Sequence, residues 1–197
     1  MGRREIQKAD TRRAILQAAY GLFEEMGYKQ ATMRELAERA GVGLGTIFKH
    51  FPDKPSILAA AFLEDVDARI DAALATLPDQ GLKAQLLHVT RAMYEFYAQA
   101  PGFSRDLLKE VMFLEGEHGA ALRGQVEAFL RGIAALVEQA VEQGEIAAGR
   151  EDVLAFWSFY FTGLQIGLSS QAFDVDAQVA MVGRLVEDHF FARGGGS

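Results

Sequence analysis

The sequence predicts an all-α fold, for three reasons. Apolar residues recur at the i, i+3, i+4, i+7 spacing of an amphipathic helix along nearly the whole chain, and no run of useful length alternates with period two. Half of the 197 residues are apolar, which is enough to build a substantial core, and 24% are charged. Only four prolines interrupt the chain, so disordered and collagen-like structures are excluded for nearly all of it.

The first helix is expected to begin at a cap formed by Asp10 or Thr11 and to end at Gly27. Its apolar residues keep the helical spacing without a gap, and they are Ile15, Ala18, Ala19, Leu22, Phe23 and Met26. This pattern predicts a helix that buries one face.

Two short helices and a glycine-containing turn come next. Thr32 stands three residues before Glu35, which is the spacing of a capping box, and a helix is therefore expected over residues 33–40. Gly41 permits the positive φ that a tight turn requires. A third helix is expected over residues 44–51.

Six longer segments complete the prediction of nine helices. Asp53 suits the N-cap position of the first of them, with Pro55 in the first turn. The six segments run from Asp53 to Pro78, from Leu82 to before Pro101, from Leu107 to about Gly116, from Leu122 to Gly144, over 153–173 and over 175–191. Residues 194–197 are expected to be a flexible tail or a remnant of cloning.

The segment 153–173 raises the question of a membrane span, because it holds 21 residues without a charge. Acidic residues flank it and polar residues interrupt it, so we expect a helix buried between other helices or between subunits. The polar residues are Ser158, Thr162, Gln165, Ser169, Ser170 and Gln171. Gly163 and Gly167 share one face, where they either allow a close helix approach or are simply tolerated in a core.

Charge is distributed unevenly along the chain. Residues 1–55 hold ten Lys/Arg and seven Asp/Glu, a net charge of +3. Because the whole chain carries −7, the remaining 142 residues carry −10. This asymmetry indicates one part that meets an anion and another that does not, although chance is the alternative.

Two absences bound the chemistry and the location. There is no cysteine, which excludes disulfides, cysteine-ligated zinc, iron–sulfur clusters and thiol catalysis. The polar start of the sequence shows no secretory signal, so a cytoplasmic location is expected.

Residues 32–51 have the steric requirements of a helix-turn-helix. By their spacing, five residues point inward: Leu36, Ala37, Ala40, Val42 and Ile47. The small side chain of Ala37 lets the second helix pass close to the first. The second helix exposes residues that can meet base edges and phosphates, namely Leu44, Gly45, Thr46, Lys49 and His50. An ordinary corner between two helices is the alternative for this segment taken alone.

With its flanks, the segment closely resembles the N-terminal domain of the tetracycline-repressor (TetR) family. The resemblance covers residues 11–58 and is carried by the amphipathic first helix and by the runs TMRELAERAGV, GTIFKHF and DKPSIL. The rest of the chain resembles the family only in its layout of six further helices. The resemblance implies a DNA-binding domain over 1–55 and an effector-binding and dimerisation domain over 56–193.

The resemblance also implies a homodimer whose two reading heads occupy successive major grooves of a palindromic operator. Thr32 would cap its helix and touch phosphate, Arg34 would lie near the groove, and Gly45 and Thr46 would open the recognition helix towards bases. The residues expected at the DNA are Thr32, Arg34, Gly43, Leu44, Gly45, Thr46, Phe48, Lys49, His50 and Lys54. Of these, Lys49, His50 and Lys54 would meet the phosphate backbone.

Three positions depart from the family pattern. Gly43 stands where many members carry Ser, and Leu44 where many carry a basic or polar residue. Phe48 replaces a common Tyr, so a hydroxyl contact to phosphate is missing. With few polar side chains on the recognition helix, we expect DNA shape and phosphate contacts to supply much of the affinity.

The family implies an effector pocket in the acidic part of the chain, with apolar walls and a few polar groups. Its expected lining is Phe62, Met93, Phe96, Tyr97, Phe103, Met112, Phe113, Phe129, Phe159, Tyr160 and Gln165. Arg105 is a further polar candidate, and plain core is the alternative for any single residue. A hydrophobic drug, an acyl chain or an aromatic metabolite would suit such a pocket.

The last two helices are expected to form the dimer interface, since their apolar surface exceeds what one small bundle can bury. The expected interface residues are Trp157, Phe161, Leu164, Leu168, Val182, Leu185 and Val186.

Enzyme and metal sites are not predicted. There is no glycine-rich phosphate loop and no serine elbow, and only Glu115 and His118 have the Glu-x-x-His spacing of a diiron bundle. Glu115, Glu117 and His118 are expected to form a solvated loop. The sequence thus predicts a ligand-responsive, sequence-specific DNA-binding regulator without a cofactor, most simply a repressor released from its operator by a small hydrophobic effector. A helical ligand-binding or interaction module without a DNA function is the alternative.

Overall fold

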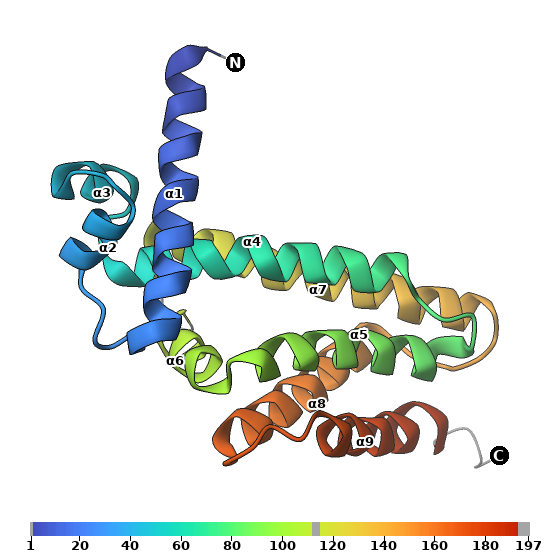
Figure 1. Cartoon of the computed structure of the whole chain (residues 1–197). Helices are drawn as coiled ribbons and strands as arrows, with labels where there is room; N and C mark the ends of the chain where they lie inside the picture. Colours follow the sequence, from blue (N-terminus) through green and yellow to red (C-terminus); the bar gives the residue numbers. More distant parts are fainter. Residues whose placement is uncertain (1, 112–114, 193–197) are drawn as a thin grey trace. The chain divides into compact units, whose positions relative to one another are not determined.

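The computed structural model describes residues 2–111 and 115–192, and it places the side chains of all of these except 62, 64, 110, 111, 117 and 118. The all-α prediction is confirmed, because no residue of the described ranges lies in a strand. The α-helices of these ranges are α1 (Arg3–Met26), α2 (Met33–Arg39), α3 (Leu44–His50), α4 (Lys54–Ala75), α5 (Gly81–Gln99), α6 (Pro101–Val111), α7 (Gly116–Glu142), α8 (Arg150–Ser169) and α9 (Val175–Val186) (Figure 1).

The chain divides into two compact units. The first comprises residues 1–65 and 102–122, and the second comprises residues 66–101 and 123–197. This division differs from the boundary expected at residue 55, because α6 and the first turns of α4 pack within the first unit. The ring of Phe103 on α6 lies 6.1 Å from that of Phe23 and 6.5 Å from that of Tyr20. The hydroxyl of Tyr20 donates to the carbonyl oxygen of Ala61 at 2.5 Å.

The start of α1 corrects the sequence prediction. The helix begins at Arg3 and not near Asp10, so Thr11 lies inside it, where its hydroxyl donates to the carbonyl of Gln7 at 2.8 Å. Asp10 pairs with Arg13 one turn later, at 3.7 Å. Periodicity could not reveal this extension, since residues 3–10 are all exposed and carry no apolar face.

The caps of the following helices confirm the prediction. The amide of Glu35 donates to the hydroxyl oxygen of Thr32 at 3.3 Å, and the amide of Thr32 donates to the carboxylate of Glu35 at 2.9 Å. Asp53 caps α4, because its carboxylate accepts from the amide of Ser56 at 2.8 Å. Gly27 and Gly41 have φ angles of 84° and 67°, which side-chain-bearing residues rarely adopt.

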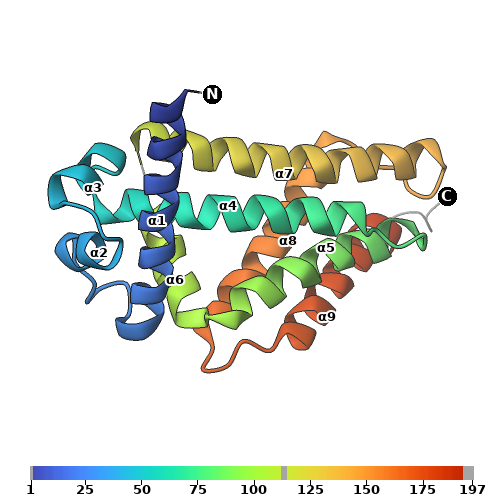
Figure 2. The ribbon, with the colours of Figure 1, turned by 45° about the horizontal axis from the view of Figure 1, so that its top comes forward.

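In the second unit, α5, α8 and α9 lie together (Figures 1 and 2). The two glycines of α8 permit this packing. A Cβ atom at Gly163 would lie 2.3 Å from the hydroxyl oxygen of Tyr94 on α5 and 3.1 Å from Val182 on α9. At Gly167 it would lie 2.3 Å from the ring of Phe173. The close helix approach therefore holds for Gly163, whereas Gly167 makes room for a side chain of the loop between α8 and α9.

The last two helices differ in extent from the prediction. The helix α8 begins three residues before the expected segment 153–173 and ends four residues before its end, and the α-helix α9 gives way to a π-helical turn over Glu187–Phe191. No helix of the described residues is long and apolar enough to span a membrane. Two serine hydroxyls of this region bond backward to their own helix: Ser158 donates to the carbonyl of Leu154 at 2.9 Å and Ser170 to that of Ile166 at 2.7 Å.

Candidate nucleic-acid interface and effector region

The helix α3 is anchored by two buried side chains and presents its opposite face to solvent. Ile47 and the C-capping residue Phe51 are fully buried. On the other face, Leu44 is 39% exposed and Phe48 is 48% exposed, although both are large and apolar. Lys49 and Gly45 are exposed beside them. A seven-residue helix with two anchors and a solvent-facing remainder is a surface built to meet a partner.

A tight turn joins α2 and α3. Leu36 and Ala37 are buried on α2, and the amide of Val42 donates to the carbonyl of Ala37 at 3.0 Å. Gly41 supplies the positive φ inside this turn. The predicted helix-turn-helix is therefore present in the structure.

Ion pairing fixes α2 against α1. A guanidinium nitrogen of Arg39 donates to the carboxylate of Glu25 at 2.5 Å, and this hydrogen bond holds the pKa of Glu25 below its ordinary value. Thr32, at the start of α2, has an exposed side chain that also donates to Glu35 at 2.7 Å. These hydrogen bonds lower the pKa of Glu35. Arg34, in the first turn of α2, is exposed as the prediction requires.

Lys54 contacts the backbone of its own unit in this structure. Its ammonium donates to the carbonyl oxygens of Tyr28 at 2.6 Å, Ala31 at 2.9 Å and Lys29 at 3.3 Å. It also lies 4.3 Å from the centroid of the Tyr28 ring. Three donors match three carbonyls, so in this structure the side chain holds the loop between α1 and α2. Sequence reasoning missed this because the partners lie more than twenty residues earlier in the chain.

His50 lies at the end of α3, close to the start of the chain. The pKa of His50 lies below its ordinary value because the ring is partly buried and because the charges of Lys8 and Arg12 disfavour its protonated form. The guanidinium of Arg12 lies 5.5 Å from the centroid of the Phe51 ring. Both causes favour the neutral form of the His50 ring, which offers one N–H donor.

This geometry has known counterparts. The family model for "Bacterial regulatory proteins, tetR family" matches residues 15–61, which include all of α2 and α3. The part of the chain that holds the helix-turn-helix therefore matches the tetR family. The repressor KstR of Mycolicibacterium smegmatis is 38% identical over 89 residues, which cover 43% of this chain and 44% of that protein. The repressor Rv1474c of Mycobacterium tuberculosis is 42% identical over 59 residues, covering 30% of this chain and 32% of that protein.

Solved structures of tetR-family regulators share the fold over most of the chain. FadR of Thermus thermophilus, in complex with lauroyl-CoA, has a TM-score of 0.71 at 21% identity and covers 90% of this chain and 94% of its own. FadR of Bacillus subtilis, in complex with stearoyl-CoA, has a TM-score of 0.67 at 20% identity, with 88% and 97% covered. In sequence, the chain spans less than half the length of the curated relatives given above.

The residues predicted to line a tetR-family effector pocket fall in several places. Met93, Tyr97, Phe129 and Tyr160 are buried in the second unit, where the ring of Phe129 lies 5.5 Å from that of Tyr160. A hydrogen bond joins the phenols of Tyr97 and Tyr160, and burial raises the pKa of both. The ring of half-buried Phe96 lies 5.4 Å from that of Tyr97.

The other predicted lining residues are more scattered. Phe103 packs inside the first unit, as described above, and Phe159 lies against the ring of His189 at 5.5 Å. Gln165 is exposed on α8, so the structure does not place this polar group in a buried site. The side chain of Phe62 and all of Met112 and Phe113 lie outside the described residues.

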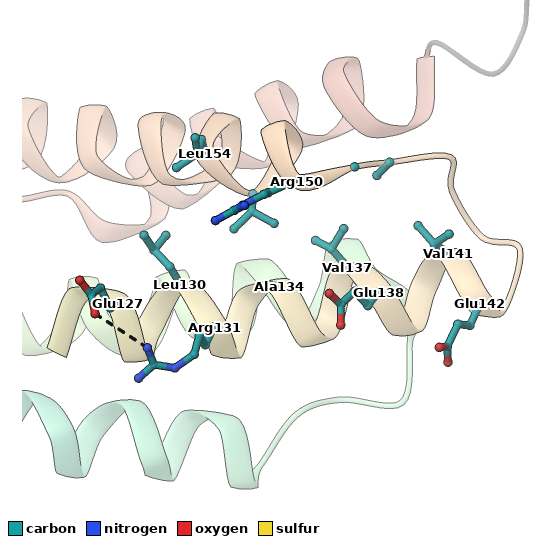
Figure 3. Close-up of a pocket in the computed structure, with 13 residues that line it drawn as sticks. Glu127, Leu130, Arg131, Ala134, Val137, Glu138, Val141, Glu142, Arg150 and Leu154 are labelled. Atoms are coloured by element: carbon teal, nitrogen blue, oxygen red, sulfur yellow. Dashed lines mark ion pairs between the residues drawn. The ribbon is translucent and has the colours of Figure 1, made fainter. Parts of the chain in front are cut away.

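A groove of about 890 Å³ lies between α7 and the start of α8. Leu130, Val137 and Val141 point into it from α7, and Arg150 lines it from the start of α8 (Figure 3). None of the residues predicted for the effector lines it. The apolar residues that line it include Leu154, which is 56% exposed. In the sequence, these residues cannot be told from core residues, because both follow the same helical spacing.

The residues predicted for the dimer interface divide into two groups. Leu164, Leu168, Val182 and Val186 are buried inside the second unit of a single chain, where they pack α8 and α9 together. The remaining three are only half-buried: Trp157, Phe161 and Leu185. Leu154 and Ile166 are exposed apolar residues of α8 that the prediction does not include, because helical periodicity does not show whether the rest of the chain covers an apolar residue.

Proposed function

We propose that this chain is a ligand-responsive, sequence-specific DNA-binding transcription regulator that represses from a palindromic operator. The observation that carries the proposal is the solvent-facing side of α3, held in place by Ile47 and Phe51 in a unit similar in sequence to known repressors. A recognition helix anchored in this way can enter the major groove and bring its exposed residues to base edges. No catalytic role is proposed.

The proposed regulator is a homodimer. Two copies of α3 about 34–36 Å apart would occupy half-sites one turn apart on the same side of the duplex. Trp157, Phe161 and Leu185 would contribute apolar surface to the interface, with Leu154 added from the structure. The four buried residues would pack α8 and α9 together behind this interface: Leu164, Leu168, Val182 and Val186.

The proposed effector is a small hydrophobic molecule that binds one conformation of the dimer better than the other and so releases DNA. Long-chain acyl-CoA is the first probe to use, because two regulators of the same fold were crystallised with lauroyl-CoA and stearoyl-CoA. The buried aromatic group around Tyr97, Phe129 and Tyr160 offers the apolar walls such a chain needs.

The test of the function is a selection from a random duplex library at about 50 and 200 mM salt. Between these two concentrations, the affinity of a protein that contacts several phosphates falls strongly. We expect enrichment of a palindrome whose affinity falls as salt rises. Thr46→Ala and Lys49→Ala should each weaken binding. Lys49→Ala should also flatten the slope of log affinity against log salt by about 1.8, for one phosphate lost in each half-site.

Lys109→Ala is the matched control, because it removes the same charge from an exposed position on α6 and should leave the slope unchanged. No enrichment, or binding insensitive to salt and to both α3 variants, would leave two explanations. Repeating the selection after unfolding, washing and refolding separates a head held inactive by a bound ligand from a module that never reads DNA.

The exposed pair Leu44 and Phe48 leads to a second prediction, that α3 reads the methyl groups of thymines. Apolar side chains in the major groove contact the thymine methyl group, which no other standard base carries. Replacing thymine by uracil in the selected half-sites removes only this methyl. We expect affinity to fall about 4-fold per contacted methyl, which corresponds to about 0.8 kcal/mol of lost burial.

The matched protein variants are Leu44→Ala and Phe48→Ala, in which the same uracil substitutions should have no further effect. If the wild type binds the uracil and thymine operators equally well, contact between these side chains and thymine methyls is wrong.

A further inference from the structure

The first three turns of α1 have no core of their own. The helix begins at Arg3, yet its first buried residue is Ile15. Residues 3–10 are exposed throughout, and this end of α1 projects beyond α2 and α3 within the first unit (Figure 1). We call residues 3–13 the arm. Residues 3–10 of the arm bury nothing in their own unit and gain little stability from packing, so their surface is available to a partner.

The arm accounts for the whole positive excess of the first 55 residues. It holds five Lys/Arg and two Asp/Glu, a net charge of +3, whereas residues 14–55 hold five of each and are neutral. Residues 14–55, which include the helix-turn-helix, therefore add no net positive charge, and the chain as a whole carries −7. Affinity for phosphates at moderate salt needs a local source of cations, and the arm is where the sequence concentrates them.

Three of the cations form one row. Arg4, Lys8 and Arg12 are spaced by four residues, so they follow one another along one face of α1. Like charges at this spacing repel one another and destabilise an isolated helix. A polyanion lying along the row would relieve this repulsion. The two acids of the arm are engaged elsewhere: Glu5 accepts from the amide of Gly2 at 3.4 Å, and Asp10 pairs with Arg13.

The row starts beside the recognition helix. Arg12 lies over the ring of Phe51, the residue that ends α3, and the charges of Lys8 and Arg12 act on His50. From Arg12 the row leads away along α1 to Arg4, a distance of about 12 Å at 1.5 Å per residue. This length equals about three to four base-pair steps of 3.4 Å along the axis of B-DNA.

We propose that the face of α1 formed by Arg4, Lys8 and Arg12 binds the backbone phosphates of duplex DNA next to the half-site that α3 reads. The contact is independent of sequence and adds affinity and orientation to the recognition by α3. This inference rests on the proposed function, since it requires that α3 meets DNA.

The test compares two double variants on the selected operator. Arg4→Gln/Lys8→Gln removes two charges from the row, and Arg12 is left in place because it packs on Phe51. Arg3→Gln/Arg13→Gln removes two charges from the other faces of the same helix. All four side chains are exposed, and glutamine keeps a high helix propensity.

We expect the row variant to bind on the order of tenfold more weakly at about 100 mM salt and to flatten the salt slope by about 3.6, for four phosphates lost per dimer. The control variant should keep a slope close to that of the wild type. Ethylation of operator phosphates should reveal positions that interfere with the wild type and the control but not with the row variant. The exchange Arg4→Lys/Lys8→Arg, which keeps both charges, should restore the wild-type slope.

Equal slopes for the row variant and the wild type, or equal losses in the two double variants, would overturn the assignment of this face. Either result would leave the proposed function intact, because the wild type would still select its palindrome. If the wild type selects no duplex after refolding, the proposed function is wrong, and so is the proposal that the arm binds DNA phosphates. Circular dichroism and the thermal midpoint of each variant confirm that the fold is unchanged.

Discussion

Replacing Lys54 by methionine is expected to destabilise the first unit by about 2–3 kcal/mol. Methionine keeps the apolar stem but removes the ammonium that donates to the carbonyls of Tyr28, Ala31 and Lys29. Hydrogen bonds to a charged donor are worth about 1.5–3 kcal/mol each, and water recovers part of the loss at the exposed carbonyl. Urea unfolding of the full chain and hydrogen exchange of the amides of residues 28–32 would measure the effect.

Lys49→Met provides the matched control, because it removes the same charge from an exposed position and should change stability by less than about 0.5 kcal/mol. The two variants should also differ on DNA: Lys49→Met flattens the salt slope, whereas Lys54→Met lowers stability first. A Lys54→Met protein that is as stable as the wild type and loses one phosphate contact per half-site would restore the role that the family resemblance implied.

A single methyl group at Gly163 is expected to destabilise the second unit by about 1–3 kcal/mol. The added Cβ would lie 2.3 Å from the hydroxyl oxygen of Tyr94, whose ring is fully buried. That hydroxyl also donates to the carbonyl of Tyr160 at 2.6 Å, so it cannot move aside without losing a buried hydrogen bond. Overpacking of a filled site usually costs this much.

Gly124→Ala is the control on a neighbouring helix. Nothing lies within 4 Å of the position its Cβ would take, so alanine there should stabilise α7 by about 0.5–1 kcal/mol. In the Gly163→Ala background, Tyr94→Phe should recover part of the loss, although alone it costs about 1 kcal/mol. Thermal or urea unfolding of the four variants decides the matter: a Gly163→Ala protein as stable as Gly124→Ala would show that α5 and α8 do not approach so closely.

The predictions made from local sequence agree with the structure where the cause is local. A capping box needs only Thr32 and Glu35, three residues apart, and the stop at Gly27 needs only the φ freedom of glycine. The start of α1 was misplaced because periodicity detects a buried face, and residues 3–10 bury nothing. An exposed helical segment shows no apolar periodicity, so its sequence pattern does not reveal that it is a helix.

At the candidate site, too, the sequence predicts what depends on local spacing but not what depends on packing. Leu44 and Phe48 were expected at the DNA, and the structure exposes them. The sequence also contained the charge of the arm, but only the helical continuation of α1 aligns Arg4, Lys8 and Arg12 into a row that starts at α3. The partners of Lys54 could not be foreseen, because packing brings together segments more than twenty residues apart.

By itself, the sequence determined the helical class, most caps and turns, and the match of residues 15–61 to the tetR family, since all of these depend on spacing over a few residues or on a short motif. Tertiary structure alone decided which apolar residues serve the single chain and which remain for a partner. Leu164 and Leu154 lie ten residues apart on α8 and are equally apolar, yet the first is buried by its own chain and the second is exposed. Burial depends on what packs opposite each residue, and periodicity along one helix does not contain that information.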